Sequence, residues 1–109
     1  MYELTTQYDH QLSIALDYDE CFTANRELWT NFILLVKSLN SKVTFVTFRY
    51  ETQHNRDILT DAKHLDIPIV FSNGKQKSSV FKADIWIDDT PITIPSLDVM
   101  TDRLNKEYE

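Results

Sequence analysis

A chain of 109 residues with 42% hydrophobic side chains is long enough to bury one core, which excludes a disordered chain and one that needs disulfides to fold. The single cysteine, Cys21, excludes an internal disulfide and is typical of a reducing compartment. A net charge of −6 argues against a general nucleic-acid coat protein, because such proteins carry basic stripes. We therefore expect one domain over residues 1–109.

Short apolar runs along the chain alternate between strand-like and helix-like patterns. Strands are predicted at residues 12–16, 43–48, 69–71 and 84–87, and helices at residues 26–39 and about 53–64, with Asn25 as the first N-cap. A closing helix is predicted at residues 96–108. The apolar spacing within the two earlier helices predicts one buried face on each, including Leu28, Leu35, Leu39 and Leu59. The alternation predicts an α/β fold with a mainly parallel sheet.

The ends of the sequence give an expectation about location. Residues 1–10 contain Glu3 and Asp9 in place of an apolar block, so we expect no signal peptide. No apolar run approaches the roughly 20 residues that a membrane-spanning helix needs. These features predict a cytoplasmic protein that does not act at a membrane.

Two pairs of aspartates follow predicted strands. Asp17 and Asp19 come after residues 12–16, and Asp88 and Asp89 come after residues 84–87. Carboxyl ends of neighbouring parallel strands meet at one sheet edge, and crowded carboxylates repel one another unless a cation lies between them. Hard oxygen ligands of this kind favour Mg²⁺, which commonly binds carboxylates together with a substrate phosphate. The pairs predict phosphate chemistry, although aspartates also cap turns after strands.

The order of polar groups resembles the four motifs of the haloacid dehalogenase-like (HAD) superfamily of phosphotransferases. LSIALDYDECFT resembles the first motif, VTFVT the second, a lysine of the SNGKQK loop the third and IWIDD the fourth. The resemblance covers residues 13–91. It implies a three-layer αβα sandwich with a Rossmann-like sheet. The intervals between motifs have no room for a cap domain, as in compact bacteriophage phosphatases.

The resemblance also implies roles for single residues. Asp17 would be the nucleophile that forms an aspartyl-phosphate, and Asp19 would protonate the leaving oxygen and then activate water. Thr47 and a lysine would hold the non-bridging phosphate oxygens. We prefer Lys77 to Lys75 because its spacing from the last acid pair resembles that of nucleotidase-like members.

The same resemblance implies a Mg²⁺ site. Its ligands would be Asp17, the backbone carbonyl of Asp19 and one of Asp88 and Asp89. The other acid of that pair would orient the ligands. The sequence leaves open which of the two binds the ion directly.

Two further residues are candidates for binding substrate. Many family members have Gly-Thr where this chain has Glu20-Cys21, so Glu20 would bring negative charge to the phosphate site and either slow turnover or restrict substrates. Arg49, two residues beyond Thr47, has the reach to bind a second phosphate or a carboxylate of the substrate, and a surface arginine is an equal alternative. We expect Cys21 to be a small structural thiol.

We therefore expect a Mg²⁺-dependent phosphomonoester hydrolase that acts on a phosphorylated small molecule, such as a nucleotide, or on a nucleic-acid end. The alternative is a catalytically weak domain that binds a phosphorylated ligand or protein partner. The chain is short for the family and would lack the outermost strand. An open sheet edge of this kind is able to pair with a second copy of the chain, so a homo-oligomer is one prediction of the sequence.

Overall fold

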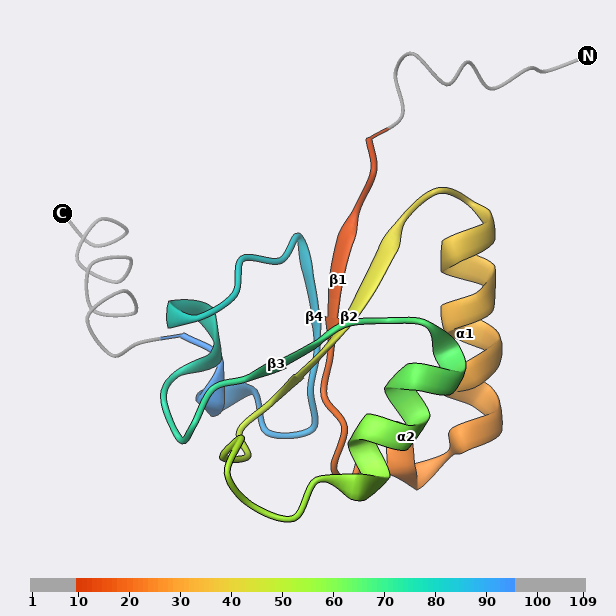
Figure 1. Ribbon diagram of the computed structural model, residues 1–109. Helices are drawn as coiled ribbons and strands as arrows, with labels where there is room; N and C mark the ends of the chain where they lie inside the picture. Colours follow the sequence, from red (N-terminus) through yellow and green to blue (C-terminus); the bar gives the residue numbers. More distant parts are fainter. Residues whose placement is uncertain (1–9, 96–109) are drawn as a thin grey trace, which may run out of the picture.

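The computed structural model describes residues 10–95, which form an α/β fold on a four-stranded, all-parallel sheet (Figure 1). Its strands are β1 (Ser13–Leu16), β2 (Lys42–Thr47), β3 (Ile69–Phe71) and β4 (Ile85–Ile87), in the sheet order β3-β2-β1-β4. The helices are α1 (Arg26–Ser38) and α2 (Arg56–Leu65), with 3₁₀ turns η2 (Phe22–Ala24), η3 (Lys77–Ser79) and η4 (Pro91–Thr93). The predicted α/β class and parallel sheet are confirmed. The helix expected at residues 96–108 lies outside the described residues.

Strand β1 lies between β2 and β4 in the sheet, and the acids of the candidate site follow β1 and β4. Leu16, its last residue, lies opposite Phe45 of β2 and Ile87 of β4 in the parallel register. The Asp17 N–H extends this pairing by donating to the Ile87 carbonyl across 2.9 Å. The residues that follow β1 and β4 therefore leave the sheet side by side, at its carboxyl edge.

Helices α1 and α2 lie together on one side of the sheet (Figure 1). Right-handed crossovers from β1 to β2 and from β2 to β3 progress in the same direction, which places both helices on the same face. The predicted N-cap is confirmed, because Asn25 Oδ1 accepts the Leu28 N–H across 3.1 Å. Lys37 of α1 donates its ammonium to the carbonyls of Leu65 and Asp66, at the end of α2. This contact satisfies carbonyls that a helix end leaves unpaired. Neither helix is long and apolar enough to cross a bilayer.

A cluster of three aromatic rings fills the core beneath the site. Tyr18 and Phe22 both meet Phe45 edge to face, with ring centroids 5.2 and 5.0 Å apart. The Tyr18 hydroxyl is buried with the ring and donates to Asp61 Oδ2 across 2.5 Å, which satisfies its hydrogen-bonding need. Burial and this carboxylate raise the pKa of Tyr18 to about 12. Tyr18 thus holds the turn after β1 against the hydrophobic core.

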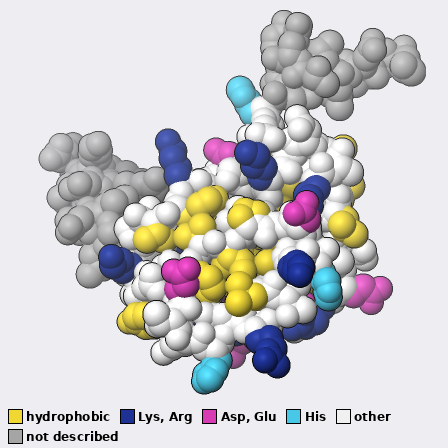
Figure 2. Space-filling view, viewed as in Figure 1, with side chains coloured by type: hydrophobic (Ala, Val, Ile, Leu, Met, Phe, Trp, Pro, Cys, Tyr) yellow, Lys and Arg dark blue, Asp and Glu magenta, His cyan; other side chains and the backbone are white. Residues whose placement is uncertain are grey.

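The prediction that four helix leucines face the core was wrong. Helix α1 turns Ile33 into the core and rests Trp29 and Val36 against it, while α2 buries Ile58, Ala62 and Leu65. Successive helical residues are about 100° apart, so the neighbouring stripe of each helix faces outward. The leucines on those outward stripes are half or more exposed, at 54%, 57%, 70% and 53% for Leu28, Leu35, Leu39 and Leu59. On the face that Figure 2 shows, hydrophobic side chains gather near the centre with charged side chains around them.

Candidate active site

Three of the four predicted carboxylates converge at the carboxyl edge of β1 and β4. Asp17, Asp88 and Asp89 each place a carboxylate oxygen within 4.8 Å of the others. The pairing of β1 with β4 causes this, because it aligns Asp17 with the turn that begins at Asp88. The predicted convergence of the two acid pairs is therefore confirmed for these three residues, in a group with the oxygen chemistry of a metal site.

Lys77 lies inside this acid cluster. Its side chain is only 2% exposed, and Nζ donates to Asp17 Oδ1 across 2.9 Å and to Asp88 Oδ2 across 2.5 Å. The lysine is carried there by η3, whereas Lys75 is exposed. A buried ammonium needs such partners, since an unpaired buried charge is strongly destabilising.

The environment shifts the pKa values of two groups at the site. Burial raises the pKa of Asp17 to about 7, the neighbouring Asp89 carboxylate adds to the shift, and the Lys77 ammonium opposes it. Burial, followed by the charge of Asp17, raises the pKa of the Cys21 thiol to about 11. Cys21 is therefore a buried thiol that keeps its proton near neutral pH.

The two acids after β4 differ in how their oxygens are used. Asp88 Oδ1 accepts the Thr90 N–H across 2.8 Å, and its other oxygen accepts from Lys77, so both of its oxygens have donors. Asp89 is exposed and faces the Asp17 carboxylate. Asp89 is thus the more accessible of the pair to an incoming cation.

Asp19 lies apart from the acid cluster because Arg49 binds its carboxylate. Arg49 Nη2 and Nε donate to the two Asp19 oxygens across 2.6 and 2.9 Å. Nη1 and Nη2 of the same guanidinium donate to Asp57 across 2.7 and 2.9 Å. Asp57 and then Asp19 raise the pKa of Arg49, and Arg49 lowers the pKa of Asp57 to about 2. No pattern in the sequence pointed to Asp57 as a site residue, because Asp57 meets Arg49 only when α2 folds back beside the end of β2.

Of the other predicted site residues, Glu20 lines the cavity over the acids, whereas Thr47 does not. Thr47 is buried at the end of β2, and its Oγ1 accepts the Arg49 N–H across 3.2 Å. Glu20 has a φ of 59°, in the left-handed region where glycine is favoured, and its N–H donates to Thr23 Oγ1. The structure therefore explains why glycine would suit this position better than glutamate.

A cavity of about 430 Å³ opens over the acid cluster, and we call it the acid cavity. Its lining residues are Asp17, Asp19, Glu20, Thr23, Phe48, Lys77, Asp88, Asp89, Thr90 and Thr93. Sequence reasoning missed Thr23, Phe48, Thr90 and Thr93. Thr90 had a usable signal, because an aspartate two residues before a backbone N–H commonly accepts its hydrogen bond in a turn.

No protein-family model, curated protein or solved structure matches the chain. The chemistry of the site thus follows from its geometry. The acid cavity combines a carboxylate on the central strand, two more from the neighbouring strand and a buried cation. Such an arrangement suits an anionic group bound through a metal ion.

Proposed function

We propose that the protein is a Mg²⁺-dependent phosphomonoesterase that works through an aspartyl-phosphate. The observation that carries the proposal is the grouping of Asp17, Asp88 and Asp89 around the buried Lys77, at the carboxyl edge of a parallel sheet. Ligands of open α/β sheets bind at that edge. The order of the four polar segments supports a HAD-like domain of three layers without a cap.

The donor set fits a divalent cation. Three carboxylates lie within reach of one ion. Burial, and then the neighbouring Asp89 carboxylate, raise the pKa of Asp17, and a bound cation would favour its ionised form. Asp17 and Asp89 are the proposed direct ligands, because both Asp88 oxygens already have donors. When bound, Mg²⁺ would offset the charge of the substrate phosphate.

In the proposed reaction, an Asp17 oxygen attacks phosphorus and the bond from phosphorus to the leaving oxygen breaks. Asp19, once released from Arg49 and protonated from solvent, gives that proton to the leaving oxygen. It then removes a proton from a water whose oxygen attacks phosphorus, and the bond from phosphorus to Asp17 breaks to release phosphate. Arg49 now occupies both Asp19 oxygens, so Asp19 must turn from Arg49 toward the acid cavity that it also lines. Lys77 would then donate to a phosphate oxygen.

The substrate class follows from the shape of the site. The acid cavity includes Phe48, which is 42% exposed and offers an aromatic surface to an organic group. A phosphorylated small molecule such as a nucleotide, or a nucleic-acid end, fits this combination of acids and aromatic ring.

Hydrolysis of p-nitrophenyl phosphate tests the proposal. Wild type should release p-nitrophenol with Mg²⁺, and release should fall to background in excess EDTA. Asp17→Asn should lose at least about 1,000-fold in kcat, because it removes the nucleophile. Asp66→Asn is the matched control, since the Asp66 side chain is fully exposed and remote from the acid cavity. Wild-type release no greater than that of Asp17→Asn, with Mg²⁺ present, would contradict the proposal.

A second function is favoured by one observation, the pairing of Asp19 with Arg49. An enzyme with its proton donor held in this way would turn over slowly, and the site would then serve to bind a phosphorylated ligand or protein partner. Calorimetry with inorganic phosphate and Mg²⁺ separates the two functions. Saturable binding without p-nitrophenol release would favour the binding function.

A further inference from the structure

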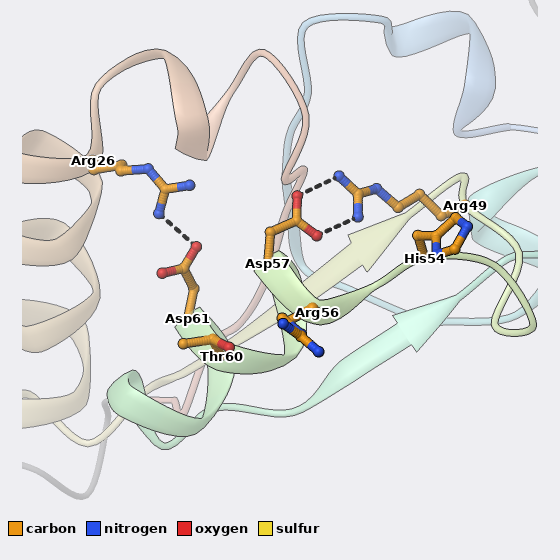
Figure 3. Close-up of a pocket in the computed structure, with 7 residues that line it drawn as sticks. All are labelled: Arg26, Arg49, His54, Arg56, Asp57, Thr60 and Asp61. Atoms are coloured by element: carbon orange, nitrogen blue, oxygen red, sulfur yellow. Dashed lines mark hydrogen bonds and ion pairs between the residues drawn. The ribbon is translucent and has the colours of Figure 1, made fainter.

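A second cavity lies beside the acid cavity, and three arginines line it. Its volume is about 550 Å³, and we call it the arginine cleft (Figure 3). Its lining residues are Arg26, Arg49, His54, Arg56, Asp57, Thr60 and Asp61. They come from the start of α1, the segment after β2 and the N-terminal part of α2. This concentration of arginine is notable in a chain with a net charge of −6.

The charges of the arginine cleft are only partly paired. Asp61 pairs with Arg26 across 2.5 Å, and Asp57 pairs with Arg49 across 2.7 Å (Figure 3). Within residues 10–95, Arg56 has no carboxylate partner, and both Arg56 and His54 are exposed. The two acids of the cleft are thus paired with Arg26 and Arg49, and Arg49 is also shared with Asp19. Arg56 is the arginine of the cleft whose charge remains available to an anion.

The backbone adds to this attraction. Arg56 is the first residue of α2, and Asp57 Oδ1 already accepts the Ile58 N–H across 2.8 Å. Within residues 10–95, the N–H groups of Arg56 and Asp57 have no hydrogen-bond acceptor. The first N–H groups of a helix point outward and carry partial positive charge. An anion near Arg56 would therefore meet a guanidinium and a helix N-terminus together.

Arg49 forms the wall between the two cavities. It lines the arginine cleft and donates to both oxygens of Asp19, which lines the acid cavity. A ligand that spans both cavities would therefore pass beside the Arg49–Asp19 pair. An anion in the cleft would also compete for Arg49 and help release Asp19 for the proton transfer described above.

We propose that the arginine cleft binds a second phosphate of the substrate. The preferred substrate is then a phosphomonoester with a neighbouring phosphate, as in a nucleoside bisphosphate or the phosphorylated end of an oligonucleotide. This inference rests on the proposed phosphatase function, since the first phosphate must lie in the acid cavity.

Phosphate release from three probes tests this. Wild type should hydrolyse thymidine 3′,5′-bisphosphate and a 5′-phosphorylated oligothymidylate with a kcat/KM about tenfold or more above that for thymidine 5′-monophosphate. Arg56→Ala should reduce this preference to within about twofold. Lys63→Ala, which removes an exposed charge from the last turn of the same helix, should keep the preference. A preference for only one of the two-phosphate probes would identify the source of the second phosphate.

Binding provides a readout that does not need turnover. In an Asp17→Asn background, Arg56→Ala should weaken binding of the fluorescent 5′-phosphorylated oligothymidylate about tenfold, measured by anisotropy. Hydrolysis of all three probes without preference, and binding insensitive to Arg56→Ala, would overturn the second-phosphate site and leave the phosphatase standing. Binding that depends on Arg56, with no hydrolysis of any probe, would overturn the phosphatase and support the cleft as an anion site.

Discussion

Lys77 Nζ lies 2.5 Å from Asp88 Oδ2, and the same ammonium reaches Asp17 on the central strand. The lysine therefore joins the ends of β1 and β4 in the way that a divalent ion would. Its charge balances only part of the cluster, because Asp89 adds a third carboxylate. The remaining negative charge is what we expect Mg²⁺ to offset.

Replacing the buried lysine should destabilise the fold. Lys77→Met removes the cation between Asp17 and Asp88, and loss of one partner from a buried ion pair costs about 3–5 kcal/mol. Urea unfolding with and without Mg²⁺ measures this, and Mg²⁺ should restore more stability to Lys77→Met than to wild type. Lys75→Met is the control and should stay within about 0.5 kcal/mol of wild type, because Lys75 is exposed. Equal losses for both variants would refute a special role for Lys77.

The pKa of Asp17 makes stability depend on pH in the absence of divalent ions. With a folded pKa of about 7, raised from 3.8, native Asp17 keeps a proton that the unfolded chain has lost. The contribution of Asp17 to stability therefore falls as pH rises from about 4 to about 7. In EDTA, wild type should lose this contribution between pH 5 and pH 8, whereas Asp17→Asn should not. The Tm of Asp17→Asn minus that of wild type should therefore increase over this range. A difference that is flat over this range would contradict the raised pKa.

The ion pair of Asp57 and Arg49 should make stability depend on pH in a more acidic range. Arg49 lowers the pKa of Asp57 to about 2, so the pair stabilises the fold above about pH 4 and this contribution is lost as pH falls toward 2. Asp57 is half-exposed, which limits the effect to under about 1 kcal/mol. Urea unfolding of wild type and Asp57→Asn at pH 7 and pH 2.5 checks this. The two proteins should differ at pH 7 and differ less at pH 2.5, and a gap of unchanged size in acid would argue against the pair.

Gly74 should be the least replaceable residue of the loop that leads to Lys77. Its φ is +78°, and an added Cβ would lie 2.6 Å from the Tyr50 hydroxyl. Tyr50 is half-exposed and can move, so the backbone conformation is the main cost, at about 1–2 kcal/mol for Gly74→Ala. Thermal unfolding should show a smaller loss for Gly74→Asn, because asparagine tolerates the left-handed region. If asparagine costs as much as alanine, the strain argument fails.

Much of the fold could be predicted because the signals are local. Short apolar runs at 12–16 and 84–87, each followed by acids, are sufficient to place Asp17 and Asp88 at one sheet edge once the sheet is parallel. Local signals could not predict which helix leucines face the core and which face solvent. Helical spacing identifies two adjacent apolar stripes on α1, and only packing decides that the stripe with Ile33 is buried while that with Leu35 is exposed.

The strand pattern predicted the site only where its groups follow a strand directly, whereas Lys77 was predicted from the resemblance to the HAD motifs. Asp17, Asp88 and Asp89 belong to that class, and the structure brings them together. Asp19 also follows a strand, but its carboxylate turns to Arg49, a contact between residues 30 positions apart. The arginine cleft has the same origin, since its residues meet only after α1 and α2 pack side by side.

Strand β4 has three residues and pairs, among the described strands, only with β1. Short elements at a sheet margin open by local unfolding more readily than central strands. Two of the three clustered carboxylates follow this strand, so an ion shared with Asp17 would tie the margin to the interior. Slower amide hydrogen exchange along Ile85–Ile87 would then report ion occupancy, and the rigidity of one sheet margin becomes a measure of the state of the site.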